Sequence, residues 1–127
     1  MKLRIHRNSL RLRLNRSDVG QFRKTGTCAE CVRFGSGSRL TYTLETSSQF
    51  TVMETQYRHD CIRVLVPSQV AQQWAESDQI SLSVDRADDR GPSVLIEKDF
   101  QCLHRDETSP SADVDAFPNP SAGDQCG

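Results

Sequence analysis

Four arginines near the start of the chain have the spacing best suited to chemistry. They are Arg4, Arg7, Arg11 and Arg13. Arg11 and Arg13 alternate with leucines, and Arg4 belongs to an earlier run of the same kind. In a strand, this alternation places the apolar side chains in a core and the arginines together on the opposite face. Because guanidinium groups bind carboxylates and phosphates through paired hydrogen bonds, the pattern indicates a surface for an anion, such as an acidic protein surface; the alternative is a solvated outer face.

The charge of the chain is unevenly distributed, although the formal net charge is only −1. Residues 1–24 carry eight basic side chains against one acidic, whereas residues 85–127 carry four basic against ten acidic. An imbalance of this kind indicates an anionic partner at the basic end, or an acidic end that folds back and neutralises it. The sequence leaves both interpretations open.

A second candidate binding site is the charged run Glu97-Lys98-Asp99, which ends an apolar, strand-like stretch shortly before Cys102. Charged groups at the end of a buried strand either face solvent or form a polar site in which each charge needs a partner. The leading interpretation is a non-enzymatic binding or accessory module with no catalytic residue. The alternative is a small enzyme with its polar site at these four residues.

Nucleic acid is a third candidate partner for the basic strands. Arginines alone are sufficient to bind a phosphate backbone. Dedicated single-strand binders also stack bases on aromatic side chains, and residues 2–14 contain no aromatic ring apart from the imidazole of His6. The sequence therefore favours another anion over nucleic acid, without excluding a backbone contact.

Cys28 and Cys31 form a C-x-x-C pair, to which Cys102 and His104 could add two more zinc ligands. The pair lies in an extended pattern, and residues three apart in a strand point to opposite faces. We therefore expect Cys28 in the core, Cys31 outside it, and no metal site. The common phosphate-binding, nucleophile-elbow and zinc-protease motifs are also absent from the sequence, so we expect no cofactor.

The elements that would position these residues are mostly strands. Alternating or apolar runs predict about eight strands, at residues 3–5, 10–14, 28–34, 40–44, 50–57, 62–66, 80–84 and 94–96. Two short helices are predicted, one capped by Ser17 and ended by Gly26, the other opened by Pro67 and Ser68. The last strand is apolar at successive positions, so it should be central and buried on both faces. The expected fold class is α+β, with a mainly antiparallel sheet that is partly closed or two-layered.

A weak internal repeat runs through these elements. A strand followed by a helix occurs twice with similar apolar spacing, first over residues 10–22 and again over residues 62–74. Two β-α-β halves related by a pseudo-twofold axis would explain this similarity. Chance similarity between amphipathic elements would explain it as well.

One domain and one tail are expected. We assign residues 1–105 to a single α+β domain and residues 106–127 to an irregular, acidic, Pro- and Ser-rich tail. No stretch approaches the apolar length of a membrane span, and the basic N-terminus lacks the apolar segment of a signal peptide. Five cysteines without such a signal are typical of a reducing compartment. These features predict a cytoplasmic protein with no membrane contact.

Two motifs near the ends of the chain point to a family. The first is R-N-S-L-R-L-R-L at residues 7–14; the second is E-K-D-F-x-C-L at residues 97–103, followed by F-P-N-P at residues 117–120. With these motifs the chain resembles a small, largely bacterial family of uncharacterised proteins, a domain of unknown function. The resemblance implies no activity and no catalytic residue. It does imply that residues 113–120 belong to the protein's own pattern, as an extended segment laid over the body.

Overall fold

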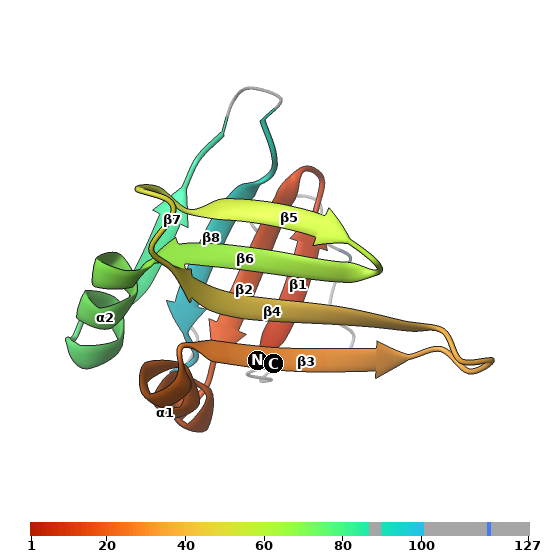
Figure 1. The fold of residues 1–127 in the computed structure, drawn as a ribbon, viewed down its shortest axis with the longest axis horizontal. Helices are drawn as coiled ribbons and strands as arrows, with labels where there is room; N and C mark the ends of the chain where they lie inside the picture. Colours follow the sequence, from red (N-terminus) through yellow and green to blue (C-terminus); the bar gives the residue numbers. More distant parts are fainter. Residues whose placement is uncertain (87–89, 101–116, 118–127) are drawn as a thin grey trace.

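The computed structural model describes residues 1–86, 90–100 and 117, and it has the α+β fold that the sequence predicts (Figure 1). Eight strands and two helices follow one another within these residues. Their bounds are β1 Lys2–His6, β2 Ser9–Leu14, α1 Arg16–Thr25, β3 Thr27–Arg33, β4 Arg39–Ser47, β5 Glu54–Arg58, β6 Cys61–Pro67, α2 Ser68–Glu76, β7 Ser81–Val84 and β8 Ser93–Lys98.

The strands form two four-stranded sheets. Sheet A has the order β1-β2-β8-β7, and sheet B has the order β3-β4-β6-β5. Four antiparallel hairpins supply the outer pairs, and each sheet is joined at its centre by one parallel pair, β2 with β8 and β4 with β6. The two sheets lie one behind the other with their strands crossing, and both helices lie at the same end (Figure 1). The fold is therefore two-layered.

The core lies between the inner faces of the two sheets and is closed at one end by the helices. The side chains of the core come from alternate positions along the strands. In β2, for example, every second residue is buried and the arginines between them are not. The largest fully buried side chains are Trp74, Phe22, Leu12, Leu14, Leu44, Ile96, Val64 and Val66. Each such side chain contributes about 1.5–3 kcal/mol of hydrophobic stabilisation.

Helix α1 begins two residues before the position that the sequence predicts. Asn15, not Ser17, is the N-cap: its side chain accepts from the backbone N–H of Asp18 at 2.8 Å, and the Asp18 carboxylate accepts from the Asn15 N–H at 3.0 Å. This reciprocal capping box satisfies two free backbone donors and places Ser17 inside the first turn. Gly26 ends the helix as predicted, with a φ of 80° and its N–H donating to Phe22 at 2.8 Å.

Two strand predictions were wrong in detail. Strand β5 begins at Glu54 rather than at residue 50, because residues 48–53 form bends and irregular backbone although Met53 still reaches the core. Strand β8 is central, as predicted, but it is buried on one face only. Val94 and Ile96 point into the core, whereas Leu95 lies half-buried on the outer face of sheet A.

The internal repeat is present in the structure and is larger than the sequence predicts. Each half is a hairpin, a helix and a second hairpin, and the first hairpin of one half pairs with the second hairpin of the other. Equivalent residues are 52 positions apart in β1 and β5, in β2 and β6, in β4 and β8, and in the two helices. The pair Arg4–Arg11 in sheet A therefore corresponds to Gln56–Arg63 in sheet B. In the same way, the pair Arg11–Leu95 corresponds to Arg63–Thr43. The two halves thus have the same topology, as the pseudo-twofold repeat suggested by the sequence requires.

Candidate functional site

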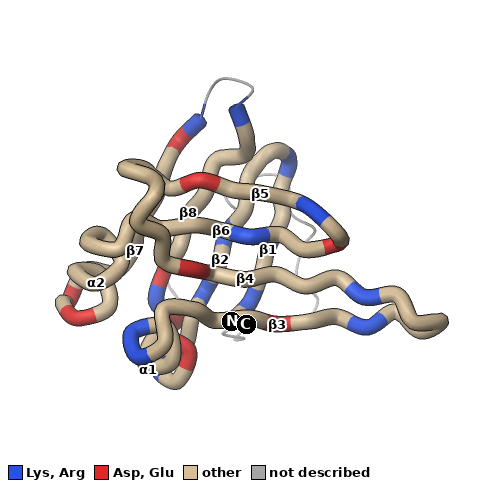
Figure 2. The backbone as a smooth tube through the Cα atoms, in the orientation of Figure 1, with Lys and Arg blue, Asp and Glu red and all other residues tan. Residues whose placement is uncertain are grey.

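Three of the four predicted arginines lie together on the outer face of sheet A. We call this surface the arginine face; it is formed by Lys2, Arg4, His6, Ser9, Arg11, Arg13, Ser93, Leu95, Glu97 and Asp99. The β1–β2 register places Arg4 opposite Arg11 and Lys2 opposite Arg13. Side chains paired in this way lie on the same face of a sheet. The blue positions on the β1 and β2 tube mark the same cations (Figure 2).

Two carboxylates at the end of β8 hold part of this charge. The Nε and Nη2 atoms of Arg11 lie 2.8 and 2.7 Å from Glu97 Oε2, and Arg13 Nε reaches the same oxygen at 3.2 Å. Asp99 lies 3.5 Å from Arg13 Nη2 and 3.3 Å from Lys2 Nζ. Glu97 and Asp99 therefore act as internal partners of the cations, and charge-assisted bonds of this kind orient the guanidinium groups.

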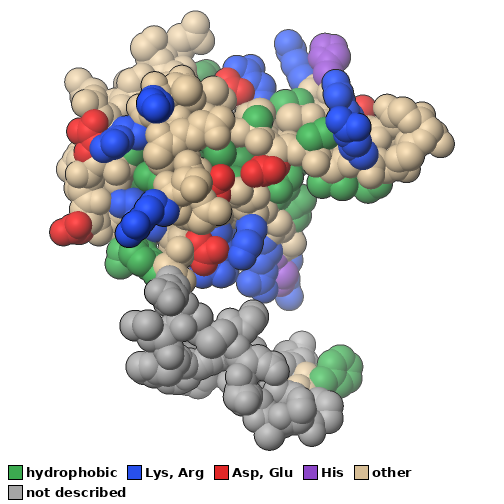
Figure 3. Space-filling view, turned by 90° about the horizontal axis from the view of Figure 1, so that it is seen from below, with side chains coloured by type: hydrophobic (Ala, Val, Ile, Leu, Met, Phe, Trp, Pro, Cys, Tyr) green, Lys and Arg blue, Asp and Glu red, His purple; other side chains and the backbone are tan. Residues whose placement is uncertain are grey.

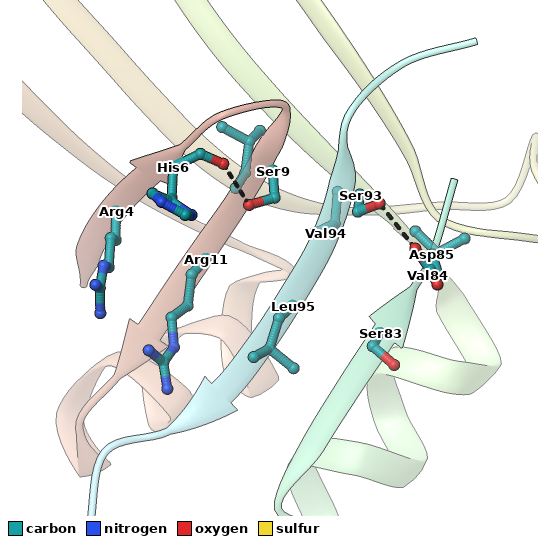
Figure 4. Close-up of a pocket in the computed structure, with 11 residues that line it drawn as sticks. Arg4, His6, Ser9, Arg11, Ser83, Val84, Asp85, Ser93, Val94 and Leu95 are labelled. Atoms are coloured by element: carbon teal, nitrogen blue, oxygen red, sulfur yellow. Dashed lines mark hydrogen bonds between the residues drawn. The ribbon is translucent and has the colours of Figure 1, made fainter. Parts of the chain in front are cut away.

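Arg4 has no ion pair with any residue that the structure describes, and its side chain is exposed. It stands beside Arg11 and His6 at a hollow of about 540 Å³ on the arginine face. Figure 4 shows Arg4 and Arg11 projecting to the same side of the sheet, with Leu95 in the floor. Across the hollow, Ser93 Oγ donates to Asp85 Oδ1 at 3.1 Å. The hollow thus has a cationic wall and a wall of hydroxyls and one carboxylate.

The other predicted binding residues lie elsewhere. Arg7 is exposed in the two-residue turn between β1 and β2, at a φ of 53°. Lys98 points to the opposite side of β8 from its neighbours, because successive strand residues alternate in direction. Its Nζ donates to the Ser77 carbonyl at 2.8 Å and lies 5.2 Å from the centre of the Trp74 ring. Glu97, Lys98 and Asp99 therefore do not form one site.

The cysteine pair has the arrangement that the sequence predicts. Cys28 is 2% exposed in the core, whereas Cys31 is exposed on the outer face of sheet B. Burial, followed by the charge of Asp18, raises the pKa of the Cys28 thiol. Among residues 1–86, 90–100 and 117, no group of three or more His, Cys, Asp or Glu side chains could hold a metal ion. Cys102 and His104 lie outside the described residues.

A second polar cluster was not found from the sequence. The Met1 ammonium lies 2.8 Å from Asp18 and 3.0 Å from Glu30, and the Tyr42 hydroxyl donates to the Met1 carbonyl at 3.1 Å. Burial alone would raise the pKa of Asp18, but hydrogen bonds from the ammonium and from the Asn15 N–H hold it below its usual range. Burial disfavours the charged form of the Met1 ammonium and by itself would lower the pKa of this group. The hydrogen bonds to Asp18 and Glu30 outweigh that effect and raise the pKa above its usual value. The sequence contained one indication of this cluster, because Asp18 is the single acidic residue among the eight basic residues of positions 1–24.

A family model matches residues 1–121, described as a family of unknown function (DUF7009). The chain belongs to DUF7009. No curated protein and no solved structure matches it. The match spans both DUF7009 sheets and both helices, so the whole arginine face lies inside it. Neither α1 nor α2 is long and apolar enough to cross a membrane.

The repeat within the DUF7009 fold provides a reference for the arginine face. Arg63 on sheet B is the equivalent of Arg11, and it donates to Glu45 at 2.8 and 3.1 Å as Arg11 does to Glu97. The bond from Arg63 is the main cause of the lowered pKa of Glu45.

The remaining cations of the arginine face have no counterpart on sheet B. The residues equivalent to Lys2, Arg4 and Arg13 in this DUF7009 chain are Glu54, Gln56 and Leu65. Gln56 accepts from Arg63 Nη1 at 2.8 Å. The Arg–Glu pair is therefore common to both halves, whereas the positive charges at Lys2, Arg4 and Arg13 are found on sheet A and not at the equivalent positions of sheet B.

Proposed function

We propose that this protein is a non-enzymatic binding module whose arginine face takes an anionic partner. One observation carries the proposal: Arg4 is exposed at a hollow beside Arg11, and no described carboxylate pairs with it. The pairs Arg11–Glu97 and Arg63–Glu45 occur at equivalent positions of the two halves, so such a pair is not by itself an indication of a binding site. The cations at Lys2, Arg4 and Arg13 have no counterpart at the equivalent positions of sheet B, which are Glu54, Gln56 and Leu65; this difference favours a binding role for sheet A.

The charge of this region supports the same proposal. On the arginine face and around its hollow, the four cations Lys2, Arg4, Arg11 and Arg13 are opposed by the three carboxylates Asp85, Glu97 and Asp99. Arg7 in the adjoining β1–β2 turn adds a further positive charge, so that two are in excess. At exposed sites each pairwise attraction is about 1 kcal/mol or less. Several such attractions acting together on one partner give useful affinity and steer its approach, and both effects weaken as salt is added.

The alternative of a small enzyme at Glu97, Lys98, Asp99 and Cys102 receives less support from the geometry. Glu97 and Asp99 are engaged by cations, and Lys98 faces the other side of β8. A general acid or base must reach its substrate with a free proton site. A nucleic-acid backbone binder remains a separate candidate, distinguished by whether a phosphate polymer binds better than a carboxylate polymer.

The cellular setting is also part of this proposal. We place the module in the cytoplasm of a bacterial cell, as the resemblance and the cysteines suggest, and residues 1–105 remain our proposed domain with 106–127 as its tail. Cys28, Cys31 and Cys61 are all free thiols in the described part of the chain, which suits a reducing compartment. Fractionation of cells that express the native gene would test this placement, and recovery outside the cytoplasm would contradict it.

The proposed function is tested with a fluorescein-labelled polyglutamate of about ten residues, long enough to span several strands at 4.7–4.9 Å each. We expect binding at low salt, measured by fluorescence anisotropy, and a loss of affinity of about fivefold to tenfold in Arg4→Gln, equivalent to about 1 kcal/mol. Arg58→Gln is the matched control, because Arg58 is an exposed arginine on the outer face of the equivalent edge strand β5. Equal affinities for the two variants, or no binding at low salt, would contradict the proposal.

A further inference from the structure

Strand β1 forms a free edge of sheet A, and that edge lies beneath an overhanging part of sheet B. β1 pairs with β2 on one side and with no described strand on the other. The start of β1 lies directly against β3 and β4, because Met1 contacts Glu30 at 3.0 Å and Tyr42 at 3.1 Å. Beyond Glu30 and Tyr42, the β3–β4 hairpin continues well past β1 (Figure 1).

The underside of this overhang is apolar and exposed. Val32 and Phe34 continue the inward-facing series of β3, but they are 42% and 66% exposed because sheet A no longer covers them. Ile5 of β1 and Tyr57 of β5 face the same side of their sheets and are 57% and 66% exposed. Figure 3 shows the apolar underside of the projecting part, with basic side chains beside it. Apolar surface gathered in this way marks an interaction site.

The backbone of β1 is ready to pair with another strand. The carbonyls of Asn8, directly before β2, and of Leu14, at its end, accept from the N–H groups of Ser93 and Asp99, so the even-numbered residues along β2 bond to β8. The odd-numbered residues of β2 therefore bond to β1, through Lys2, Arg4 and His6. The N–H and C=O groups of Leu3 and Ile5 consequently point to the free edge.

The charges on β1 determine which strand could add there. Side chains of an added strand would lie alternately beside Lys2 and Arg4 on the arginine face and beside Ile5 under the overhang. A second copy of β1 would bring cations opposite cations, which destabilises a strand pair. An added strand with acidic residues on one face and apolar residues on the other would match both the arginine face and the apolar underside of the overhang.

We propose that β1 binds an extended peptide segment of a partner protein, with alternating acidic and apolar residues, as a fifth strand of sheet A. This inference rests on the proposed function, since the acidic side chains of the peptide meet the arginine face. Backbone hydrogen bonds to Leu3 and Ile5 provide affinity, and the alternation provides specificity. The site thus combines an open edge, an apolar roof and a cationic face.

The test uses the full chain and two capped, labelled peptides of about eight residues, long enough to cover a strand such as β1. One peptide alternates Glu and Val, and the other has the same composition in two blocks. We expect the alternating peptide to bind at least about tenfold more tightly, because only alternation directs every Glu to one face. It should also slow amide hydrogen exchange at Leu3 and Ile5, measured by NMR.

The matched variants are Ile5→Pro and Thr55→Pro, which lie on the two edge strands β1 and β5; Thr55 is the equivalent of Leu3, since Thr55 pairs with Val64 as Leu3 pairs with Leu12. Each proline removes an N–H that points away from the sheet, so the hairpin ladder is retained. We expect Ile5→Pro to weaken binding of the alternating peptide by about tenfold or more, from the loss of an edge hydrogen bond and its strand geometry, and Thr55→Pro to leave it unchanged. If Ile5→Pro does not fold, the inference is still tested by amide hydrogen exchange at Leu3 and Ile5 of the unsubstituted chain, compared with and without the alternating peptide.

Three outcomes would overturn the inference. If both peptides bind equally and no β1 amide is protected, the arginine face binds anions without strand addition, and the proposed function stands alone. If neither peptide nor polyglutamate binds, the proposed function fails too. If Leu3 and Ile5 are already protected in the free chain, the edge is occupied by residues 106–127, which include five acidic side chains, or by a second copy when protection rises with protein concentration.

Discussion

Phe22 and Trp74 occupy equivalent positions in the two halves of the chain, and their rings meet edge to face. The centroids are 6.3 Å apart and the ring planes are inclined at 66°. Both side chains are fully buried, one from α1 and one from α2. The pair therefore joins the two helices, and aromatic pairs of this geometry add about 0.5–1.5 kcal/mol to the stabilisation that comes from burying their area.

Trp74→Ala should be the most destabilising of the aromatic truncations. The change leaves a cavity, removes the bond from Nε1 to the Ile80 carbonyl at 3.1 Å, and removes the ring beneath Lys98. We expect a loss of about 3–5 kcal/mol in the free energy of unfolding. Urea denaturation followed by far-UV circular dichroism would measure it, because the substitution removes the single tryptophan.

Trp74→Phe provides the control for that experiment. It keeps an aromatic edge against Phe22 and loses the Nε1 hydrogen bond, so its cost should be clearly smaller, about 1–2 kcal/mol. Similar costs for the two variants would show that the hydrogen bond to Ile80, rather than the ring pair, provides most of the stabilisation.

The sequence was sufficient to predict the fold class, the alternation of β1 and β2 and the opposite directions of Cys28 and Cys31. These features depend on period-two patterns that are local. The exchange of hairpins between the two halves could not be predicted, because the parallel pairs that make it, such as Leu10 with Val94 and Tyr42 with Ile62, join strands that are not neighbours in the chain and leave no local pattern. The site shows the same division. Arg11 and Arg13 were predicted on one face, but their pairing with Glu97 depends on the parallel contact between β2 and β8.

The cysteines should differ sharply in reactivity. Cys28 is buried and burial raises the pKa of its thiol, whereas Cys31 is exposed. Since the thiolate is the reactive form, we expect iodoacetamide to modify Cys31 in the folded protein and Cys28 only after unfolding. Peptide mass spectrometry of protein alkylated with and without urea would measure both sites. Equal labelling of the two thiols in the folded protein would contradict the placement of Cys28 in the core.

The ion pair between Met1 and Asp18 should make stability depend on pH at both ends of the range. The pKa of Asp18 is lowered in the folded state, so its contribution is complete above its usual value near 4 and disappears as the pH falls through the folded value. The pKa of the ammonium is raised, so its contribution is complete below its usual value near 8 and disappears as the pH rises through the folded value. The pair therefore stabilises most between about pH 5 and pH 7.

Asp18→Asn should flatten that dependence. The variant leaves the ammonium with Glu30 alone, and we expect a loss of about 1–3 kcal/mol near pH 6, which shrinks toward acid and toward base. Asp78→Asn serves as the control, since Asp78 is exposed after α2. Thermal melts across the pH range would show it. A constant difference between Asp18→Asn and the unsubstituted chain at every pH would contradict the stabilising role of the ion pair between Met1 and Asp18.

Glu97→Gln should separate stability from binding. Glu97 is 15% exposed and joins Arg11 to Arg13, so its neutralisation should lower the free energy of unfolding by about 1 kcal/mol. The same change releases both guanidinium groups to an external anion. We therefore expect the variant to bind polyglutamate several-fold more tightly while it melts at a lower temperature.

Glu45→Gln tests whether that gain belongs to the arginine face. Glu45 holds Arg63 as Glu97 holds Arg11, so a similar loss of stability is expected. Sheet B, however, presents Glu54, Gln56 and Leu65 where sheet A presents its additional cations, and the affinity for polyglutamate should therefore not change. A gain in both variants would show that any released arginine attracts the polymer. A loss in Glu97→Gln alone would mean that Glu97 orients the arginines for the partner rather than competing with it.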